Sequence, residues 1–139
     1  MSEKFDELVR IMDRLRGEDG CPWDQEQTLA SVFDCMRDEL DEVREAVEAE
    51  DGASLGEELG DLLFTLVFAV RIGRENEWFT MDDVLGGICE KLIRRHPHIF
   101  GEKQDLTTEE VLAQWERIKA EEKRQKAAKS PPGEGGVDA

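Results

Sequence analysis

The sequence lacks the features that mark secreted, membrane-spanning and disulfide-linked proteins. Its 139 residues contain three cysteines, Cys21, Cys35 and Cys89, and no two of them form a C-x-x-C pair. An odd number of isolated cysteines favours reduced thiols in a cytoplasmic protein. Residues 1–16 are charged and helix-patterned, which is not typical of a signal peptide. The apolar run at residues 62–70 is far shorter than the roughly 20 residues that span a bilayer. We therefore expect a cytoplasmic protein with no membrane partner.

Basic residues and histidines are also scarce. The chain holds 18 Lys and Arg against 34 Asp and Glu, and its net charge is −16. Residues 1–90 contain 8 basic and 25 acidic residues, whereas residues 91–139 contain 10 and 9. Such an acidic body repels DNA and RNA, so we expect no nucleic-acid partner. A phosphate ligand would need help from metal ions or from a local basic cluster.

What the sequence does contain is helical periodicity, with neither an internal repeat nor a convincing strand. Apolar residues recur at helical spacing in several segments. The helices that we expect cover approximately residues 3–16, 29–50, 55–76, 81–95 and 108–127. The sequence thus predicts an all-α fold, a bundle of four to five helices in one domain at residues 1–127. Residues 128–139 have little to bury, and we expect a disordered tail there.

Capping residues and prolines set the expected helix boundaries. Thr28 is a candidate N-cap after a loop that we expect at residues 21–28. Pro97 is expected to end the helix at residues 81–95. Two capping boxes of the form S/T-x-x-E are expected to open later helices, at Ser54 with Glu57 and at Thr107 with Glu110.

The helix expected at residues 55–76 is unusually apolar. From Leu62 to Val70 only Thr65 is polar. A helix that is hydrophobic on nearly every face belongs in the middle of a bundle or at a subunit interface. This run is the first structural reason to expect a homo-oligomer.

Two carboxylate pairs with the same offset lie close to this run. D-E-L-D-E-V, residues 38–43, holds Glu39 and Glu42, and G-E-E-L-G-D-L-L, residues 56–63, holds Glu58 and Asp61. Residues three apart share one face of a helix, and two helices joined by a short connection commonly pack antiparallel. The two pairs can therefore face each other across a helical hairpin.

Four converging carboxylates repel one another and stay ionised in a low dielectric only with a cation between them. Oxygen-only ligands suit Mg²⁺, with Mn²⁺ as a substitute, rather than zinc. The only histidines, His96 and His98, lie elsewhere, which argues against a ferritin-like di-iron site with its E-x-x-H pairs. The competing interpretation is chance, because acidic pairs on a solvated helix face are common in so acidic a chain.

Positive charge gathers in E-K-L-I-R-R-H-P-H-I-F-G, residues 90–101, where Lys91 and Arg95 share a helix face. Such a pair could clamp a polyphosphate opposite a metal-loaded acidic face, although a solvated helix end would be the better explanation if this segment stood alone. Further on, Trp115 and Lys119 are also four apart. The indole could stack on a base while the lysine meets a phosphate, or the tryptophan could simply belong to the core.

Taken in order, five blocks resemble the MazG nucleotide pyrophosphohydrolases of the all-α NTP pyrophosphatase superfamily. They are C-P-W-D-Q-E-Q-T, D-E-L-D-E-V, E-E-L-G-D-L-L, E-K-L-I-R-R-H-P-H-I-F and W-E-R-I-K. The resemblance covers roughly residues 5–127. It implies a helical protein that forms a tight homodimer or a dimer of dimers. It also implies hydrolysis of a nucleoside triphosphate between the α and β phosphates, in the presence of Mg²⁺ or a similar ion.

The resemblance also implies roles for individual residues. The metal ligands would be Glu39, Glu42, Glu58 and Asp61, the phosphate-contacting cations Lys91 and Arg95, and the nucleotide-binding residues Trp115 and Lys119. Either Glu42 or Asp38 would accept the proton of the attacking water. The chain departs from the family at Asp38, where many members have Glu, and at Gly86-Gly87, which should weaken a helix. It carries a single copy of a domain that some members carry twice.

Three other readings stay open at this point. The chain could be a related enzyme that acts on phosphoribosyl-ATP or on one pyrimidine triphosphate. It could also be a helical module that binds a nucleotide or a protein without hydrolysis. The last reading is a plain helical oligomer whose acidity serves solubility.

Overall fold

The computed structural model describes residues 2–129, and within this range every regular element is a helix. The five long helices agree with the predicted ones to about three residues at each end, so the all-α prediction is confirmed. Residues 130–139, most of the predicted tail, lie outside the described residues, whereas α7 reaches Lys129. The helices are α1 (Glu3–Arg16), α2 (Pro22–Glu26), α3 (Leu29–Glu48), α4 (Gly52–Glu75), α5 (Met81–Arg95), α6 (Pro97–Phe100) and α7 (Thr108–Lys129).

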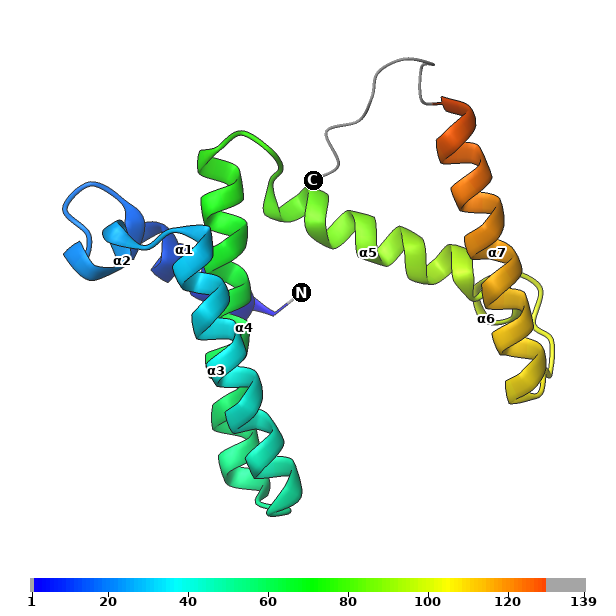
Figure 1. Cartoon of the computed structure of the whole chain (residues 1–139), viewed down its shortest axis with the longest axis horizontal. Helices are drawn as coiled ribbons and strands as arrows, with labels where there is room; N and C mark the ends of the chain where they lie inside the picture. Colours follow the sequence, from blue (N-terminus) through cyan, green and yellow to red (C-terminus); the bar gives the residue numbers. More distant parts are fainter. Residues whose placement is uncertain (1, 130–139) are drawn as a thin grey trace. The chain divides into compact units, whose positions relative to one another are not determined.

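The chain divides into two compact units, Met1–Val84 and Leu85–Ala139. In the first unit α3 and α4 lie side by side, and α1 packs against α4 (Figure 1). Each helix directs apolar residues into one core, formed by Met12, Val32, Val67, Phe68 and Ile72. Full burial of such a side chain stabilises the fold by about 1.5–3 kcal/mol. The core therefore fixes the α3–α4 pair on which both carboxylate pairs lie.

A tight turn joins α3 to α4 and corrects one predicted boundary. Glu50 adopts a left-handed φ of 52°, and its amide donates to the Val47 carbonyl while the Asp51 amide donates to the Ala46 carbonyl. This Schellman arrangement satisfies the last carbonyls of α3. Asp51 then caps α4, accepting from the Ser54 amide at 3.2 Å and the Ser54 hydroxyl at 2.7 Å. The predicted N-terminal capping box at Ser54 is therefore wrong, because Asp51 takes the capping role one turn earlier.

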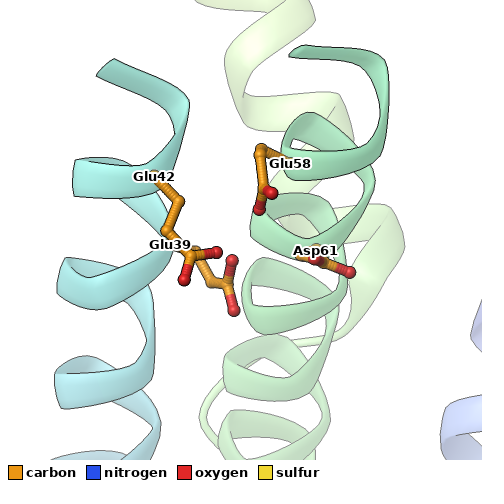
Figure 2. Close-up of side chains that lie close together, drawn as sticks. All are labelled: Glu39, Glu42, Glu58 and Asp61. Atoms are coloured by element: carbon orange, nitrogen blue, oxygen red, sulfur yellow. The ribbon is translucent and has the colours of Figure 1, made fainter. Parts of the chain in front are cut away.

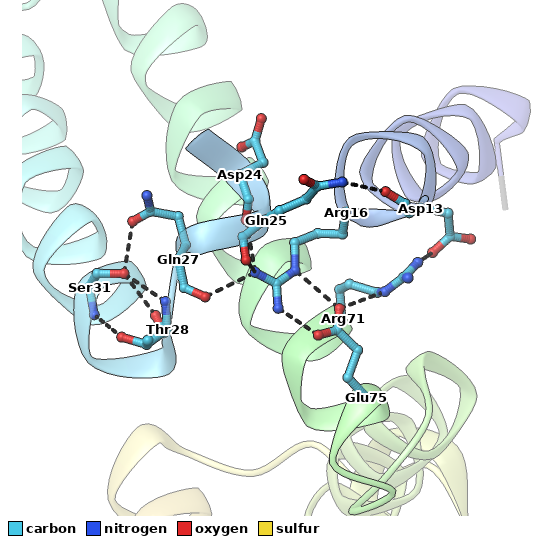
Figure 3. A network of polar contacts seen from close by, with 10 residues as sticks. Asp13, Arg16, Asp24, Gln25, Gln27, Thr28, Ser31, Arg71 and Glu75 are labelled. Atoms are coloured by element: carbon cyan, nitrogen blue, oxygen red, sulfur yellow. Dashed lines mark hydrogen bonds and ion pairs between the residues drawn. The ribbon is translucent and has the colours of Figure 1, made fainter. Parts of the chain in front are cut away.

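The loop predicted at residues 21–28 contains a short helix instead, α2, with Pro22 at its first position. So short a helix is not stable by itself. The Arg16 guanidinium stabilises it, donating from Nη1 to the carbonyl oxygens of Asp24, Gln25 and Gln27 at 2.8, 3.2 and 2.9 Å (Figure 3). Thr28 caps α3 as predicted, because its hydroxyl accepts from the Ser31 amide.

The second unit contains most of α5 with α6 and α7. Of its described residues only His98 is buried, and its ring lies 2.9 Å from the side-chain nitrogen of Gln114. The predicted capping box of α7 is present, since the Thr107 hydroxyl accepts from the Glu110 amide at 3.2 Å. α5 runs without a break through Gly86 and Gly87. Polar and ring contacts, rather than a hydrophobic core, thus connect α5 to α7.

Candidate metal centre

The structure brings the four predicted carboxylates together in the first unit. Glu39 and Glu42 project from α3, and Glu58 and Asp61 project from α4. Figure 2 shows the two glutamates of α3 directed toward Glu58, with Asp61 beside them. One carboxylate oxygen from each residue lies within 4.8 Å of the others. The three-residue offset on two packed helices produces this arrangement, as the sequence predicts.

The burial of individual oxygens separates this cluster from an ordinary acidic surface. Glu42 and Asp61 are exposed, whereas Glu39 and Glu58 are half-buried. Oε2 of Glu39 and Oε2 of Glu58 are out of solvent and have no hydrogen-bond partner among the described residues. An unsatisfied buried carboxylate oxygen is costly unless a cation or a proton compensates it. Four carboxylates with two such oxygens are a donor set that fits a hard divalent cation such as Mg²⁺.

The carboxylates also alter one another's titration. The proximity of the Glu42 carboxylate, with which Glu58 can share a proton, raises the pKa of Glu58 to about 7, and burial and repulsion from the other three carboxylates add to this effect. Burial is the largest cause of the raised pKa of Glu39, followed by the possibility of sharing a proton with Glu42. Without a cation, the cluster thus retains a proton near neutral pH. A divalent cation would displace that proton and reverse the direction of both shifts.

A groove of about 340 Å³ adjoins the cluster on the side of the α3–α4 turn. It is of the size that small-molecule sites have. Its acidic wall would repel a free phosphate group, so an anionic ligand needs cations beside it. The residues that line it are Glu42, Glu45, Ala46, Ala49, Asp51, Ser54 and Glu58.

Asp38, the other predicted proton acceptor, lies outside the cluster of four. Its side chain is exposed. Its charge nevertheless contributes to the raised pKa of Glu39. Asp38 is therefore near enough to interact with the cluster electrostatically without being one of its four grouped carboxylates.

The four residues predicted to bind substrate all lie in the second unit. Arg95 and Trp115 are in contact, with the guanidinium carbon 5.1 Å from the centre of the indole ring. Lys119 follows Trp115 by one turn of α7 and lies 3.9 Å from Glu116. Lys91 is exposed one turn before Arg95 on α5. The indole is thus half-buried against a cation, which is the geometry of a cation–π contact.

Two residues with extensive contacts were missed by the sequence analysis. Arg16 holds the α2 turn and pairs with Glu75, and Glu122 of α7 pairs with both Arg94 and Arg95. Glu122 could have been found, because Trp115, Lys119 and Glu122 are spaced by four and three residues along one helix face. The pattern around Arg16 gives no comparable signal.

Within the described residues, no helix is both long and apolar enough to cross a membrane. The fold and the cluster together define a small all-helical domain with four grouped carboxylates whose oxygens could hold a metal ion. Residues 27–100 match the family model of the MazG nucleotide pyrophosphohydrolase domain. The chain belongs to this family. The match includes the four carboxylates, Lys91 and Arg95, and it ends before Trp115 and Lys119.

Several relatives carry names that describe an activity. The nucleoside triphosphate pyrophosphohydrolase of Escherichia coli is 46% identical over 128 residues, which are 91% of this chain and 49% of the relative. The nucleoside triphosphate pyrophosphohydrolase/pyrophosphatase MazG of Thermotoga maritima is 44% identical over 122 residues, 88% of this chain and 46% of the relative. The chain thus spans about half the length of these curated relatives.

A solved structure agrees with the fold. The crystal structure of a MazG-related protein from Thermotoga maritima superposes with a TM-score of 0.73 and 27% sequence identity. The similarity covers 83% of this chain and 98% of that protein.

Proposed function

We propose that the protein hydrolyses nucleoside triphosphates to the monophosphate and pyrophosphate in the presence of Mg²⁺. The observation that carries this proposal is the carboxylate cluster with its two unsatisfied buried oxygens, in a chain of the MazG family. The names of the relatives support the reaction class. A role in clearing unwanted nucleotides from the cellular pool is part of the same proposal.

Glu39, Glu42, Glu58 and Asp61 would hold the cation, with Mn²⁺ as a possible substitute for Mg²⁺. A bound cation would neutralise negative charge on the phosphate oxygens and would lower the pKa of a bound water. Glu39 and Glu42 belong to α3, and Glu58 and Asp61 belong to α4, which packs beside it. The cluster is thus held in place by helices rather than by loops, which favours a defined geometry.

In the proposed reaction the oxygen of a water molecule attacks the α-phosphorus, and the bond from this phosphorus to the oxygen bridging to the β-phosphate breaks. Pyrophosphate leaves with the bridging oxygen, and the nucleoside monophosphate gains the water oxygen. A carboxylate accepts the proton of the water. The candidates remain Glu42, which lies in the cluster and borders the groove, and the exposed Asp38.

Lys91 and Arg95 are proposed to contact phosphate oxygens and to stabilise the charge that develops on the leaving pyrophosphate. Trp115 and Lys119 are proposed to contact the nucleotide. The contact between Arg95 and Trp115 supports a shared role for these two residues. An arginine stacked on an indole loses less freedom when it binds an anion, because its plane is already restricted.

Pyrophosphate release from a panel of ribo- and deoxynucleoside triphosphates tests the function. We expect release from several substrates with Mg²⁺, weaker or comparable release with Mn²⁺, and none in EDTA. Phosphoribosyl-ATP belongs in the panel, because selective turnover of this compound would indicate a related enzyme with a different substrate. Equal release with and without a chelator would contradict the proposal. Binding without release would instead indicate a nucleotide-binding module.

We also propose that the protein forms a homo-oligomer through the outer face of α3 and α4. Phe33, Leu40 and Val47 recur every seven residues along α3 and are each more than half exposed, at 57%, 56% and 55%. Leu63 and Leu66 of α4 are 40% and 47% exposed. A stripe with a seven-residue repeat is typical of helices that pack against other helices. Two helices from each of two copies would complete a four-helix bundle.

Sedimentation equilibrium tests this interface. We expect a dimer or tetramer for the unmodified chain and a lower mass for Leu40→Glu, because a buried charge in an apolar stripe is costly. Leu112→Glu is the matched control, since Leu112 is equally exposed at 60% but lies on α7. A monomeric unmodified chain would rule out the proposal.

A further inference from the structure

Glu122 of α7 bridges two arginines at the end of α5. Its Oε1 accepts from Arg95 Nη2 at 2.9 Å, and its Oε2 accepts from Arg94 Nε at 2.6 Å. A longer contact of 3.5 Å joins the same Oε2 to Arg95 Nε. The carboxylate thus takes the Nε–Nη2 edge of Arg95 with both oxygens, which is the bidentate geometry of strong arginine–carboxylate pairs.

The Arg95 guanidinium is restricted on a second side by an aromatic ring. Its central carbon lies 5.1 Å from the centre of the Trp115 indole, and the His96 ring packs edge-on against the same indole. The Arg95 side chain is only 16% exposed, whereas that of Arg94 is 42% exposed. The carboxylate fixes one edge of the group and the indole restricts its plane. Arg95 is therefore the more constrained of the two arginines.

An arginine has a second bidentate edge, formed by Nη1 and Nη2. Within the described residues, Arg95 Nη1 donates no hydrogen bond, so this end of the group remains available to an anion. Arg94 has a further partner in the exposed Glu90 at 3.7 Å, whereas Glu122 is the only carboxylate paired with Arg95 among the described residues. Hydrogen bonds from Arg95 and Arg94 lower the pKa of Glu122 to about 2, so the bridge persists at any physiological pH. These contacts hold Arg95 in one orientation while its Nη1 donors have no partner among the described residues.

We propose that Glu122 is a positioning residue for substrate binding. It holds the Nε–Nη2 edge of Arg95 so that the Nη1–Nη2 end faces a phosphate group of the nucleotide. This inference rests on the proposed function of Arg95 as a phosphate-contacting cation. Glu122 does not touch the substrate itself, and it acts through the arginine.

Glu122→Gln tests the inference because it keeps the size of the side chain and removes the charge. We expect the KM for the triphosphate to rise about tenfold, since freeing a long side chain costs binding entropy when it must be ordered again. We expect kcat to stay within about twofold. The neighbouring Glu121→Gln is the matched control, because Glu121 pairs with Arg124 on its own helix. It should leave both constants unchanged.

A double-mutant cycle separates positioning from a merely structural role. In an Arg95→Ala background, Glu122→Gln should have no further effect on KM, because the residue through which it acts is gone. A further loss of equal size there would show that Glu122 acts otherwise. A fall in KM for Glu122→Gln would overturn the inference in another way, since it would mean that the carboxylate competes with phosphate.

Binding of a non-hydrolysable triphosphate analogue, followed by calorimetry in the presence of Mg²⁺, keeps the test independent of turnover. Weaker binding by Glu122→Gln supports positioning even if hydrolysis is absent, in which case only the proposed reaction fails. Unchanged binding and KM in a turnover-competent protein would overturn the role of Glu122 and leave the proposed function intact. Absence of both binding and turnover in the unmodified chain would overturn both.

Discussion

Replacing Asp61 with alanine is expected to lower pyrophosphate release by roughly 100-fold or more. Changing a residue that merely orients a metal ligand typically costs 10–100-fold, so loss of a ligand itself should cost at least as much. Asp61 is exposed on α4 and adds no apolar contact to the core. The helical fold should therefore survive, which circular dichroism can verify. Glu57→Ala is the matched control, because Glu57 is an exposed carboxylate of the same helix outside the cluster.

Thermal melting provides a second measurement, in which the effect of Asp61→Ala on the melting temperature should differ between EDTA and Mg²⁺. In EDTA the Asp61→Ala protein should melt no lower than the unmodified chain, because the Asp61 charge repels Glu39 and Glu58. Added Mg²⁺ should raise the melting temperature of the unmodified chain and have little effect on the variant. Equal stabilisation of both proteins by Mg²⁺ would show that the cluster does not bind the cation.

The melting response to Mg²⁺ should also depend on pH. The pKa of Glu58 is raised from 4.5 to about 7, so without a cation the folded state binds this proton more tightly than the unfolded state does. The stability of the metal-free protein should therefore fall as the pH rises between these two values. Mg²⁺ must displace the proton at low pH. Its stabilising effect should consequently be larger at about pH 8 than at about pH 5.5.

Replacing Arg16 with alanine is expected to be the most destabilising single change outside the core. The Arg16 side chain is 8% exposed, and it joins α1 to the α2 turn and to Glu75 of α4. Its removal takes one donor from each of three carbonyl oxygens of the α2 turn, and it leaves Glu75 with Arg71 as its remaining partner. Glu75 is one-third exposed and keeps its pair with Arg71, so the loss of the Arg16 hydrogen bonds is expected to cost about 1–3 kcal/mol. Hydrogen bonding to Arg16 is also the main cause of the lowered pKa of Glu75.

Thermal or urea unfolding checks this prediction, and we expect a fall in melting temperature on the order of 5–10 °C. Arg16→Lys should restore little of the lost stability. A single ammonium group cannot replace the planar guanidinium, which donates to three carbonyl oxygens and a carboxylate at once. Arg14→Ala is the control, since Arg14 is exposed on the same helix. If Arg16→Ala unfolds at the same temperature as the unmodified chain, the network in Figure 3 contributes no net stability.

Much of the candidate site followed from local sequence patterns. The offset of three residues in each carboxylate pair predicts a shared helix face, and a short connection predicts that the faces meet. The structure brings Glu39, Glu42, Glu58 and Asp61 within 4.8 Å of one another, while their role as metal ligands remains a prediction. Lys91 and Arg95 were singled out from their spacing of four along one helix, and their role in phosphate binding stays a prediction.

Other features were not accessible from the sequence because they depend on distant contacts. Arg16 donates to carbonyl oxygens 8 to 11 residues away and pairs with Glu75, which is 59 residues away. Every residue has a backbone carbonyl, so no sequence pattern indicates which of them will accept a hydrogen bond from Arg16. The predicted loop at residues 21–28 was wrong for a similar reason, since Arg16 of α1 donates to carbonyl oxygens of the short helix that lies there.

The sequence by itself determined the all-α class, the approximate limits of the long helices and the faces that carry the charged pairs. These properties follow from periodicity and capping, which act over one or two helical turns. Only the tertiary structure decided which oxygens of Glu39 and Glu58 lose solvent and which edge of Arg95 is taken by Glu122. Burial and side-chain pairing depend on how helices pack, and packing is a property of residues far apart in the chain.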